Sequence, residues 1–335
     1  MTAPVVIAEA GVNHNGDLGR ARAMVAAAAD AGADYVKFQA FSAETLVAKG
    51  ARTAPYQAAN AGVADQAELL AGLEIGMDGM AVLAEDCRKR SIGFLCTPFD
   101  LATARGLVAL GMDRIKVASG ELTNSESLAA FAGFGLPVIL STGMATLAEV
   151  EAAVTLLRAH GGADITLLHC TSLYPAPAQT LNLRAMVTMA KVFALPVGYS
   201  DHSLGDYAAV AAVALGARVI EKHFTLDRAL PGPDHAASLE PDELAGLIGK
   251  LRLCAVALGD GDKHPAAGEV EIALLVRRSW HAARDLAPGT VLDDSDVALL
   301  RPADGLDPRA RPVGRSLRRA LAANEPIRED DLEAV

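Results

Sequence analysis

The sequence contains few features that would place the protein outside the reducing interior of a cell. Its four cysteines, Cys87, Cys96, Cys170 and Cys254, are widely scattered and form no Cys-x-x-Cys pair, and three of them lie in apolar stretches typical of buried thiols. The N-terminal segment lacks the basic region that precedes the apolar core of a secretory signal. We therefore expect a cytoplasmic protein with free thiols.

Long apolar runs and an excess of positive charge are also missing. The most apolar window, residues 208–215, is less than half of the about 20 residues that a membrane-spanning helix needs. Lys and Arg number 30 against 41 Asp and Glu, and the resulting net charge of −11 repels nucleic-acid backbones and anionic membranes. Neither nucleic acid nor membrane is an expected partner.

Hydrophobic residues make up 51% of the 335 residues, enough for two domains or for one barrel with an appendage. Short apolar, β-rich runs alternate with longer Ala- and Leu-rich stretches. Eight such pairs in about 260 residues predict an α/β fold, a (β/α)8 TIM barrel, with a doubly wound sheet as the alternative. The predicted strands are 5–10, 35–39, 92–96, 114–118, 138–142, 165–170, 197–200 and 219–223, and the predicted helices are 18–31, 78–90, 101–110, 125–134, 147–160, 181–193, 204–215 and 241–258.

Two regions depart from this rhythm. The connection 41–77 is far longer than an ordinary strand-to-helix loop, and such loops usually cover an active site. After residue 258 the chain becomes turn-rich, and residues 284–297 resemble residues 319–332 as an internal pseudo-repeat of short β segments. We therefore predict a barrel domain over 1–260, a linker over 261–278 and a small, mostly-β domain over 279–335, whose thin core should dock on another surface.

Polar or ionisable side chains stand at the end of nearly every predicted strand. In a barrel these ends meet at one mouth, where catalytic groups collect, so we predict the active site there. In chain order they are Glu9, Asn13, His14, Asn15, Lys37, Gln39, Thr97, Lys116, Ser119, Glu121, Ser141, Thr142, His169, Thr171, Ser172, Ser200, Asp201, His202, Glu221, Lys222 and His223.

Three of these residues are lysines, which are rare in a buried barrel mouth. Lys37, Lys116 and Lys222, with the hydroxyls of Thr97, Ser119 and Ser200, predict a cationic, donor-rich floor within an acidic protein. Such a floor suits a small, highly charged anion such as a phosphorylated acid. A lysine of this set could instead be the Schiff-base nucleophile of an aldolase, and the residues alone leave both chemistries open.

Histidine is the second distinctive residue type at the mouth. His202 and His223 end neighbouring strands and could face one point, where two imidazoles with oxygen ligands fit a borderline divalent metal. Glu9, Asp201 and Glu221 are candidates for further ligands or for anchors of the ligands. His169 is a candidate hydrogen-bonding residue of the barrel interior, whereas His160, His264 and His281 have the surroundings of surface or linker residues.

A rigid Pro- and Gly-rich loop, residues 226–242, follows the last of these strands directly. Ser238, with Glu240 and Asp242 after it, has the pattern of a helix N-cap. Asp234 has no capping duty in this arrangement, and we expect it to be free to contact a substrate.

With the strand-end residues and the loop described above, nine blocks of the sequence resemble the sialic acid synthases, which condense phosphoenolpyruvate with a 2-acetamido sugar to a nonulosonic acid. The likeness spans essentially the whole chain, and the tail, with residues 299–302 and the pseudo-repeat, resembles the family's C-terminal antifreeze-like SAF domain, a β-clip. The nine matching blocks are residues 8–16, 36–39, 94–99, 115–121, 139–144, 168–171, 198–202, 221–224 and 231–234.

The resemblance implies roles for individual residues. Lys37, Thr97, Lys116, Ser119 and Ser200 would hold phosphoenolpyruvate, and His202 and His223 would bind Mn²⁺ or a similar metal. It also implies a domain-swapped homodimer in which the antifreeze-like domain covers the partner's barrel. The acceptor sugar would meet Gln39, Asn60, Glu121, Ser172, Tyr174 and Asp234, with Arg301 closing the other subunit's site.

The acceptor sugar itself is left open by the sequence. We expect N-acetylmannosamine as the main reading, yet Ser172 stands where some N-acetylneuraminate synthases have Asn, and Tyr56, Gln57, Asn60 and Gln66 in the long connection look more like synthases of legionaminic acid. The alternative acceptor is therefore 2,4-diacetamido-2,4,6-trideoxymannose, and a 6-phosphorylated sugar is a further possibility.

The mechanism implied by the resemblance is the same for each acceptor. The metal polarises the open-chain aldehyde, C3 of phosphoenolpyruvate attacks it, and water adds at C2 before phosphate leaves by C–O cleavage. Lys116 and His202 are expected catalytic residues, and Glu9 or Glu121 is expected to guide the water. A non-catalytic sugar-binding module, built around the tail, would bind sugar but release no phosphate.

Overall fold

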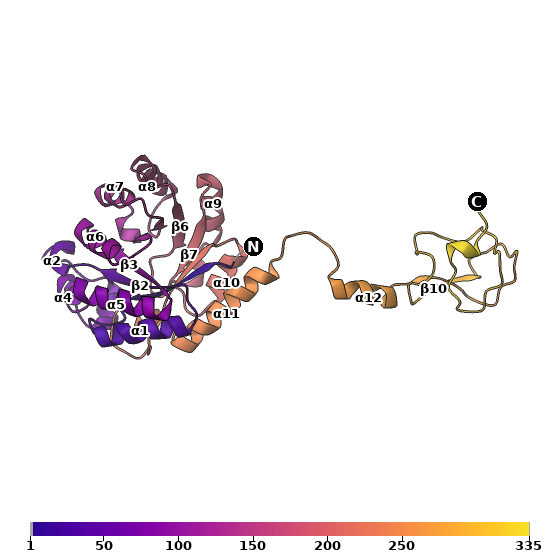
Figure 1. Cartoon of the computed structure of the whole chain (residues 1–335), viewed down its shortest axis with the longest axis horizontal. Coiled ribbons are helices and arrows are strands. Elements are labelled where there is room, and N and C mark those ends of the chain that lie inside the picture. Colours follow the sequence, from indigo (N-terminus) through magenta and orange to yellow (C-terminus); the bar gives the residue numbers. More distant parts are fainter. Residues whose placement is uncertain (1–2, 335) are drawn as a thin grey trace. The chain divides into compact units, whose positions relative to one another are not determined.

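Eight parallel strands, each a short apolar run, form one sheet in the computed structural model, which describes residues 3–334. The hydrogen-bonded order is β3-β2-β1-β8-β7-β6-β5-β4, and β3 lies beside β4, so the sheet curves round into a barrel (Figure 1). The predicted TIM barrel is confirmed, and the doubly wound sheet is wrong. The strands are β1 (Val5–Gly11), β2 (Tyr35–Ala40), β3 (Gly93–Pro98), β4 (Ile115–Val117), β5 (Val138–Ser141), β6 (Ile165–Cys170), β7 (Val197–Asp201) and β8 (Val219–His223).

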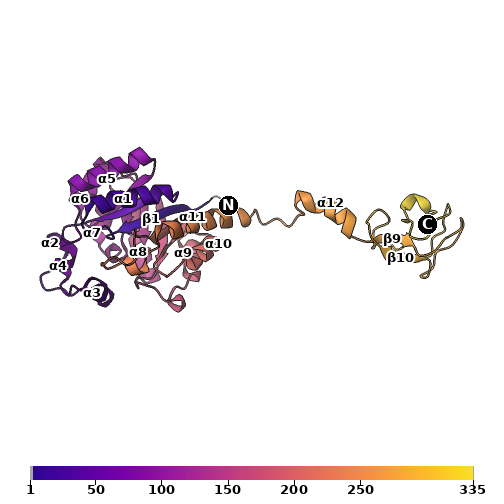
Figure 2. The ribbon, with the colours of Figure 1, turned by 90° about the horizontal axis from the view of Figure 1, so that it is seen from below.

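Helices follow the strands and surround them (Figure 2). Short polar side chains fix where several of them begin: Asp17 accepts a hydrogen bond from the Arg20 N–H, and Asp100 accepts one from the Thr103 N–H at 2.7 Å. In the described residues, no helix is both long and apolar enough to cross a membrane. The surrounding helices are α1 (Leu18–Asp30), α5 (Met77–Arg90), α6 (Leu101–Ala109), α7 (Ser125–Ala132), α8 (Leu147–Ala159), α9 (Arg184–Phe193), α10 (Tyr207–Ala214) and α11 (Pro241–Ala257).

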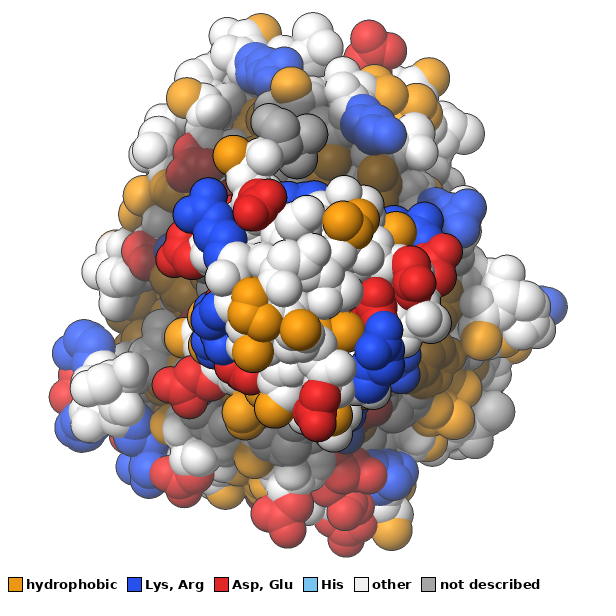
Figure 3. Space-filling model, turned by 90° about the vertical axis from the view of Figure 1, so that its right-hand side faces the viewer, with side chains coloured by type: hydrophobic (Ala, Val, Ile, Leu, Met, Phe, Trp, Pro, Cys, Tyr) orange, Lys and Arg blue, Asp and Glu red, His pale blue; other side chains and the backbone are white. Residues whose placement is uncertain are grey.

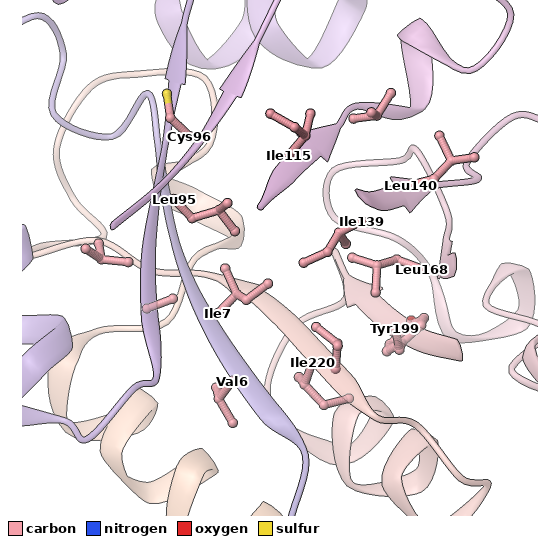
Figure 4. Packing of buried hydrophobic residues seen from close by; sticks show 14 of the residues in the cluster. Val6, Ile7, Leu95, Cys96, Ile115, Ile139, Leu140, Leu168, Tyr199 and Ile220 are labelled. Carbon is pink, nitrogen blue, oxygen red and sulfur yellow. The ribbon is translucent and has the colours of Figure 1, made fainter. Parts of the chain in front are cut away.

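Strand periodicity sorts side chains between the inside of the barrel and its helix-covered outside. Ile7, Leu95, Ile139 and Leu168 come from four strands and point toward the barrel centre, where they are buried (Figure 4). Because successive side chains of a strand alternate between faces, the residue two positions further along points the same way. Above this apolar layer the inner face therefore carries Glu9, Thr97, Ser141 and Cys170, at the carboxyl ends of the same strands.

The long second connection contains helices that the sequence pattern did not predict, since each is only one or two turns long. They are α2 (Ala43–Leu46), α3 (Pro55–Ala61) and α4 (Gln66–Ala71). A small apolar cluster of Val12, Phe41, Leu69 and Leu73 gives this segment its own core beside the barrel mouth.

The predicted N-cap at Ser238 is wrong. Helix α11 begins with Pro241 after Glu240, whose N–H donates to the Glu243 carboxylate at 2.9 Å. The buried Ser238 hydroxyl instead donates to the Asp234 carbonyl at 2.8 Å and accepts from Asn13 Nδ2 at 2.9 Å. Ser238 thus supports the loop that carries Asp234.

The chain divides into two units, Met1–Asp260 and Gly261–Val335. The second contains β9 (Ser279–Ala282) and β10 (Val297–Leu300), which pair antiparallel, and its core includes Leu292 and Ile327. Leu286 and Leu321, at equivalent positions of the pseudo-repeat, bond to each other through their backbones at 2.8 and 3.0 Å. The two copies therefore pair about a local pseudo-twofold axis. On the molecular surface, charged side chains of both signs are interspersed (Figure 3).

Two features of the second unit differ from prediction. Residues assigned to a linker include a helix, α12 (Ala267–Val276), which escaped notice because its apolar residues follow no single helical face. His281 is buried rather than on the surface: its Nδ1 lies 3.0 Å from the Ser279 carbonyl and its Nε2 lies 3.3 Å from Asp304. His160 and His264 are exposed, as predicted.

Candidate active site

A cavity of about 450 Å³ opens at the carboxyl ends of the barrel strands, where the sequence predicts the site. Residues from all eight strands and from the long second connection line it. The predicted site residues among its lining are Glu9, Lys37, Gln39, Thr97, Lys116, Ser119, Ser172, Tyr174, Ser200, His202, His223 and Asp234.

A larger cavity of about 650 Å³ lies beside it, next to α8 and α9, and shares Met144, Cys170 and Ser172 with it. Several of its polar groups are already engaged: His169 Nε2 lies 2.7 Å from the Leu181 carbonyl, and the Thr171 and Thr188 hydroxyls donate to backbone carbonyls. We therefore take the smaller cavity, which holds the charged groups, as the candidate active site.

Two lysines and two glutamates form the floor of this cavity, and we name Glu9, Lys37, Lys116 and Glu221 the inner cluster. Lys37 Nζ lies 2.9 Å from Glu9 Oε2 and 3.6 Å from Glu221 Oε2, and Lys116 Nζ lies 3.7 Å from Glu221 Oε1. All four side chains are at least 95% buried. A four-charge cluster withdrawn from water is costly unless its members are paired, as they are here.

Burial and the attraction between opposite charges shift the pKa values of the four inner-cluster residues in different directions. Burial raises the pKa of Glu9 to about 7, an effect that the neighbouring Lys37 only partly offsets. Burial acts the same way on Glu221, but Lys116 and Lys37 hold its pKa below the ordinary value. Burial lowers the pKa of Lys116, whereas Glu221 and Glu9 outweigh burial and raise that of Lys37. Near pH 7, Glu221 is therefore ionised and Glu9 can exchange a proton.

Hydroxyl groups surround the inner cluster and are oriented by it. Thr97 accepts a hydrogen bond from Lys37 Nζ at 3.1 Å, Ser141 accepts one from Lys116 Nζ at 2.8 Å, and Ser119 accepts the Gly143 N–H at 3.0 Å. Because each oxygen already accepts, its own hydrogen is left to donate into the cavity.

Two imidazoles lie next to the inner cluster, His202 after β7 and His223 at the end of β8, where His223 is the register partner of Glu9. Their ring centroids are 5.3 Å apart. His202 Nδ1 lies 2.8 Å from the Thr171 carbonyl, and its Nε2 lies 3.0 Å from the Tyr174 hydroxyl. Among the described residues, His223 Nδ1 and Asp234 Oδ1 are buried without a hydrogen-bond partner, and His223 Nδ1 lies 3.9 Å from the other Asp234 oxygen.

These three side chains fit a divalent cation by their chemistry. Burial lowers the pKa of His223 well below its ordinary value, so the ring is neutral and able to act as a ligand at pH 7. Burial also raises the pKa of Asp234 to about 6, and a nearby cation would favour its ionised form. In residues 3–334 no cluster of three or more His, Cys, Asp or Glu has the geometry of a complete metal site.

The loop that presents Asp234 is held from two directions. Asn15 Nδ2 donates to the Pro231 carbonyl at 2.7 Å, and Asn60 Nδ2, from α3, donates to the Pro233 carbonyl at 2.9 Å. Gly232 is required between the prolines: its φ is +152°, and a β-carbon there would lie 2.7 Å from the His235 ring. Asn60 therefore supports this loop and is absent from the described lining of the cavity.

Not every predicted residue belongs to the cavity. Lys222 and Asp201 point to the outer face of the sheet and pair with each other at 2.8 Å, so their assignment to the mouth is wrong. Glu121, on the short 3₁₀ turn Ser119–Glu121, accepts a hydrogen bond from Asn124 and is absent from the described lining. His169 points outward and stacks on Tyr199, so it is not a residue of the barrel interior. Arg301 is an exposed residue of the second unit.

The structure also gives several residues contacts that the sequence did not reveal. Glu221 connects both lysines of the inner cluster, although its strand-end position marked it only as a possible ligand. Tyr56 stacks on Tyr174 with centroids 5.1 Å apart, and Cys170 Sγ lies 3.6 Å from Ser119 Oγ and 3.8 Å from His202 Nδ1. The strand-end rule finds Glu221 but not its bonds to both lysines, and the long connection points to Tyr56 without indicating that it stacks on Tyr174.

Comparison with known proteins agrees with this geometry. The NeuB family model matches residues 24–263, and the SAF domain model matches residues 277–333. An N,N'-diacetyllegionaminic acid synthase of Legionella pneumophila is 45% identical over 98% of this chain and 94% of its own length, and one of Campylobacter jejuni is 45% identical over 91% and 92%.

Among solved structures, an N-acetylneuraminic acid synthetase of Leptospira borgpetersenii in complex with citrate is 38% identical, with a TM-score of 0.73 over 81% of this chain and 90% of its own. The family model covers most of the barrel, and both relatives match nearly end to end. The resemblance noted in the sequence is confirmed. The chain belongs to the NeuB family, and it is an enzyme of the nonulosonic acid synthase class.

Proposed function

We propose that this enzyme condenses phosphoenolpyruvate with open-chain 2,4-diacetamido-2,4,6-trideoxymannose and water, giving N,N'-diacetyllegionaminic acid and phosphate. The observation that carries the reaction is the inner cluster and two imidazoles lining one cavity. The acceptor rests on the two legionaminic acid synthases at 45% identity, against 38% for the N-acetylneuraminic acid synthetase. These comparisons favour the alternative acceptor over N-acetylmannosamine, the main expectation from the sequence.

Phosphoenolpyruvate would bind over the inner cluster. Lys37 and Lys116 supply two ammonium groups, and the hydroxyls of Thr97, Ser119 and Ser141 have hydrogens left to donate. Ser200, in contrast, donates to Glu221 at 2.9 Å and would accept from a ligand or reorient on binding. Point charges with directional donors around them suit a carboxylate and a phosphate on one small molecule.

A divalent cation, for which we propose Mn²⁺, would be held by His202 and His223 with Asp234 beside it. The mixed nitrogen and oxygen donors suit a borderline metal, and the unpartnered His223 Nδ1 and Asp234 Oδ1 supply the chemistry. When bound, such a cation polarises the acceptor's aldehyde oxygen as a Lewis acid.

The acceptor would lie under the long second connection. Tyr56 and Tyr174 form a stacked pair there, and Val12, Leu70 and Phe99 give the cavity an apolar wall. This wall suits the C6 methyl and the acetamido methyls of a deoxy sugar better than it suits a 6-hydroxyl or a 6-phosphate. Gln39 and Ser172 supply polar contacts beside it.

The chain's own residues would then guide bonds and protons. C3 of phosphoenolpyruvate attacks the aldehyde carbon, C2 becomes electron-poor, and water adds to C2. Glu9, whose Oε1 lies 3.2 Å from Gln39 Nε2, takes the proton of this water, and its raised pKa of about 7 suits that task. Glu121 suits it less, because it is absent from the described lining of the cavity. Lys37 and Lys116 stabilise the phosphate that leaves with the bridging oxygen. Solvent ¹⁸O is expected at C2 of the product, and label in phosphate alone would contradict this step.

The proposal includes a cytoplasmic homodimer. The four cysteines are free thiols, in keeping with a reducing compartment. Four apolar side chains of α12, Val270, Ile272, Leu274 and Leu275, are between 53% and 68% exposed, which favours a covering partner. Arg301 would complete the site of the other subunit. Mixing Arg301→Ala and Lys37→Met chains, each inactive alone, should restore activity in heterodimers, and failure to do so would contradict the exchange.

A coupled assay for phosphate tests the proposed reaction. Purified enzyme with Mn²⁺, phosphoenolpyruvate and the diacetamido sugar should release one phosphate for each nonulosonic acid formed, and a chelator should abolish both. Borohydride with either substrate should trap no lysine adduct. Phosphate-free product formation that survives the chelator would instead favour the Schiff-base aldolase, and sugar binding without any turnover would favour a binding module.

A further inference from the structure

A third buried lysine lies outside the cavity, on the face of the sheet that the helices cover. Lys222 on β8 stands directly opposite Asp201 on β7 in the strand register, and both side chains have 0% exposure. Their atoms Nζ and Oδ2 are 2.8 Å apart. We name this pair the outer clamp. It is as deeply buried as the inner cluster, yet it lines no part of the described cavity.

The outer clamp surrounds the residue that carries one of the imidazoles. Lys222 Nζ donates to the Ser203 carbonyl at 2.5 Å in addition to Asp201. Asp201 Oδ1 accepts the Ser203 N–H at 2.9 Å and the Ser203 hydroxyl at 2.7 Å. His202 lies between Asp201 and Ser203 in the chain, so the clamp holds the backbone on both sides of it. His223 is the residue that follows Lys222 along β8.

The clamp lies where the backbone ladder stops. Asp201 and Lys222 are the last residues paired between β7 and β8, and beyond them β7 continues into a loop, whereas His223 is still paired with Glu9 of β1. The bond from Lys222 to the Ser203 carbonyl thus extends the connection between β7 and β8 beyond the ladder, past His202.

Hydrogen bonds inside the cavity hold only one of the two imidazoles, so the outer clamp is left to position the other. His202 has hydrogen-bonding neighbours at both ring nitrogens, but His223 Nδ1 has none among the described residues. The position of His223 therefore depends on its backbone, which is held by β1 and Leu239 on one side and lies next to the clamp on the other, and on ring contacts with His202 and Tyr174. A displaced end of β8 would change the separation of the two rings directly.

We infer that Lys222 and Asp201 are positioning residues, which fix the separation of His202 and His223 from the outer face of the barrel and thereby set the affinity of this imidazole pair for a divalent cation. The inference rests on the proposed metal site. Partners that orient metal ligands from outside the coordination shell commonly change metal affinity by roughly 10- to 100-fold.

The test is a titration of the full-length protein with Mn²⁺, followed by electron paramagnetic resonance. Lys222→Met leaves a buried carboxylate unpaired and could fail to fold, so the deciding variant is Asp201→Asn with Lys222→Met, which removes both charges. We expect this double variant to fold and to bind Mn²⁺ with a Kd roughly 10- to 100-fold higher, while its Kd for phosphoenolpyruvate without metal is unchanged.

A matched control separates positioning from general stability. Leu83→Ala on α5 removes a fully buried side chain next to β3, away from β7 and β8, and should lower stability without changing the Kd for Mn²⁺. A folded double variant with the unaltered Kd would overturn the inference. If the unaltered protein itself binds no Mn²⁺, the proposed metal site is wrong. The clamp is then judged by the crystal structure of the double variant, where rings still 5.3 Å apart would overturn it.

Discussion

The inner cluster and the outer clamp both pair lysines with carboxylates, at the carboxyl ends of the barrel strands, and both are removed from water. The inner cluster keeps its charges in competition: Lys37 faces two carboxylates, and Glu9 shares that lysine with Glu221. The outer clamp is a closed pair in which Lys222 and Asp201 bond to each other and to Ser203. The comparison teaches that buried charges which share their partners mark a site for chemistry, whereas buried charges paired one to one mark a structural site.

The largest effect is expected at Glu9. Glu9→Gln should lower kcat/KM by about 10²- to 10⁴-fold, the usual contribution of a general base, because an amide cannot take the proton of the attacking water. Since the base acts when deprotonated, kcat/KM of the unaltered enzyme should rise as pH increases through about 7, and this rise should be lost in the variant. An unchanged pH profile in Glu9→Gln would assign the rise to another group.

The same pKa gives a stability prediction with a definite sign. Folding raises the pKa of Glu9 from 4.5 to about 7. The stability contributed by its protonated form is fully present below pH 4.5 and is lost as pH rises through about 7. In the presence of a chelator, Glu9→Gln should therefore weaken this loss in urea unfolding between pH 5 and about 8, and a steeper loss would contradict it.

At Lys222 the expected effect is on folding. Lys222→Met should reduce the free energy of unfolding by about 3–5 kcal/mol, because Asp201 is left buried and unpaired. Adding Asp201→Asn should recover most of this loss. Urea denaturation measures both, and a single variant as stable as the unaltered protein would show that the clamp is not a closed pair.

Lys116 is expected to behave in the opposite way. Lys116→Met should lower kcat/KM by about 10²- to 10³-fold through loss of charge at the departing phosphate. Its free energy of unfolding should fall by less than in Lys222→Met, because burial already disfavours the lysine's charge and Lys37 remains beside Glu221. Loss of stability with retained activity would reverse the roles that we assign to the two lysines.

The smallest effect is expected beside the inner cluster, at Gly143. A β-carbon at this position would lie 2.3 Å from Ser172 Oγ and 2.9 Å from Ser119 Oγ, so Gly143→Ala must displace the hydroxyl that the Gly143 N–H orients. We expect KM for phosphoenolpyruvate to rise about tenfold with kcat little changed, as for one lost hydrogen bond.

Steady-state kinetics measure this effect, and two further variants sharpen it. Adding Ser172→Ala, which removes the nearest atom, should restore part of the lost affinity. Gly246→Ala on α11, whose β-carbon would meet no described atom within 4 Å, is the control and should leave KM unchanged. An equal KM in Gly143→Ala and the control would contradict the role of this glycine.

The contrast between the inner cluster and the outer clamp also shows how much of the fold and of the site the sequence could predict. Alternating apolar and helical segments were sufficient for the barrel, and the strand-end rule found Lys37, Lys116, His202 and His223. The same rule could not assign Lys222, because it gathers all residues near a strand end, although successive residues point to opposite faces. The predicted strand 219–223 coincides with β8, and its alternation separates Lys222 from Glu221 and His223.

Other differences have equally physical causes. The short helices of the long second connection depend on packing around Leu69 and Leu73 rather than on their own propensity, so no local pattern could predict them. The burial of His281 depends on pairing between the copies of the pseudo-repeat, which the sequence suggests but does not fold. Asn60 was expected to touch the sugar, and only the structure reveals its bond to the loop of Asp234.

The central claim, a nonulosonic acid synthase that uses the diacetamido deoxy sugar, is tested most directly by competition. N-acetylmannosamine and 2,4-diacetamido-2,4,6-trideoxymannose, at equal concentrations, compete for the enzyme with phosphoenolpyruvate and Mn²⁺, and mass spectrometry of the two acids gives the ratio of kcat/KM. We predict N,N'-diacetyllegionaminic acid in excess by at least about tenfold, the discrimination of a pocket that matches one substituent. N-acetylneuraminic acid as the main product would contradict the account.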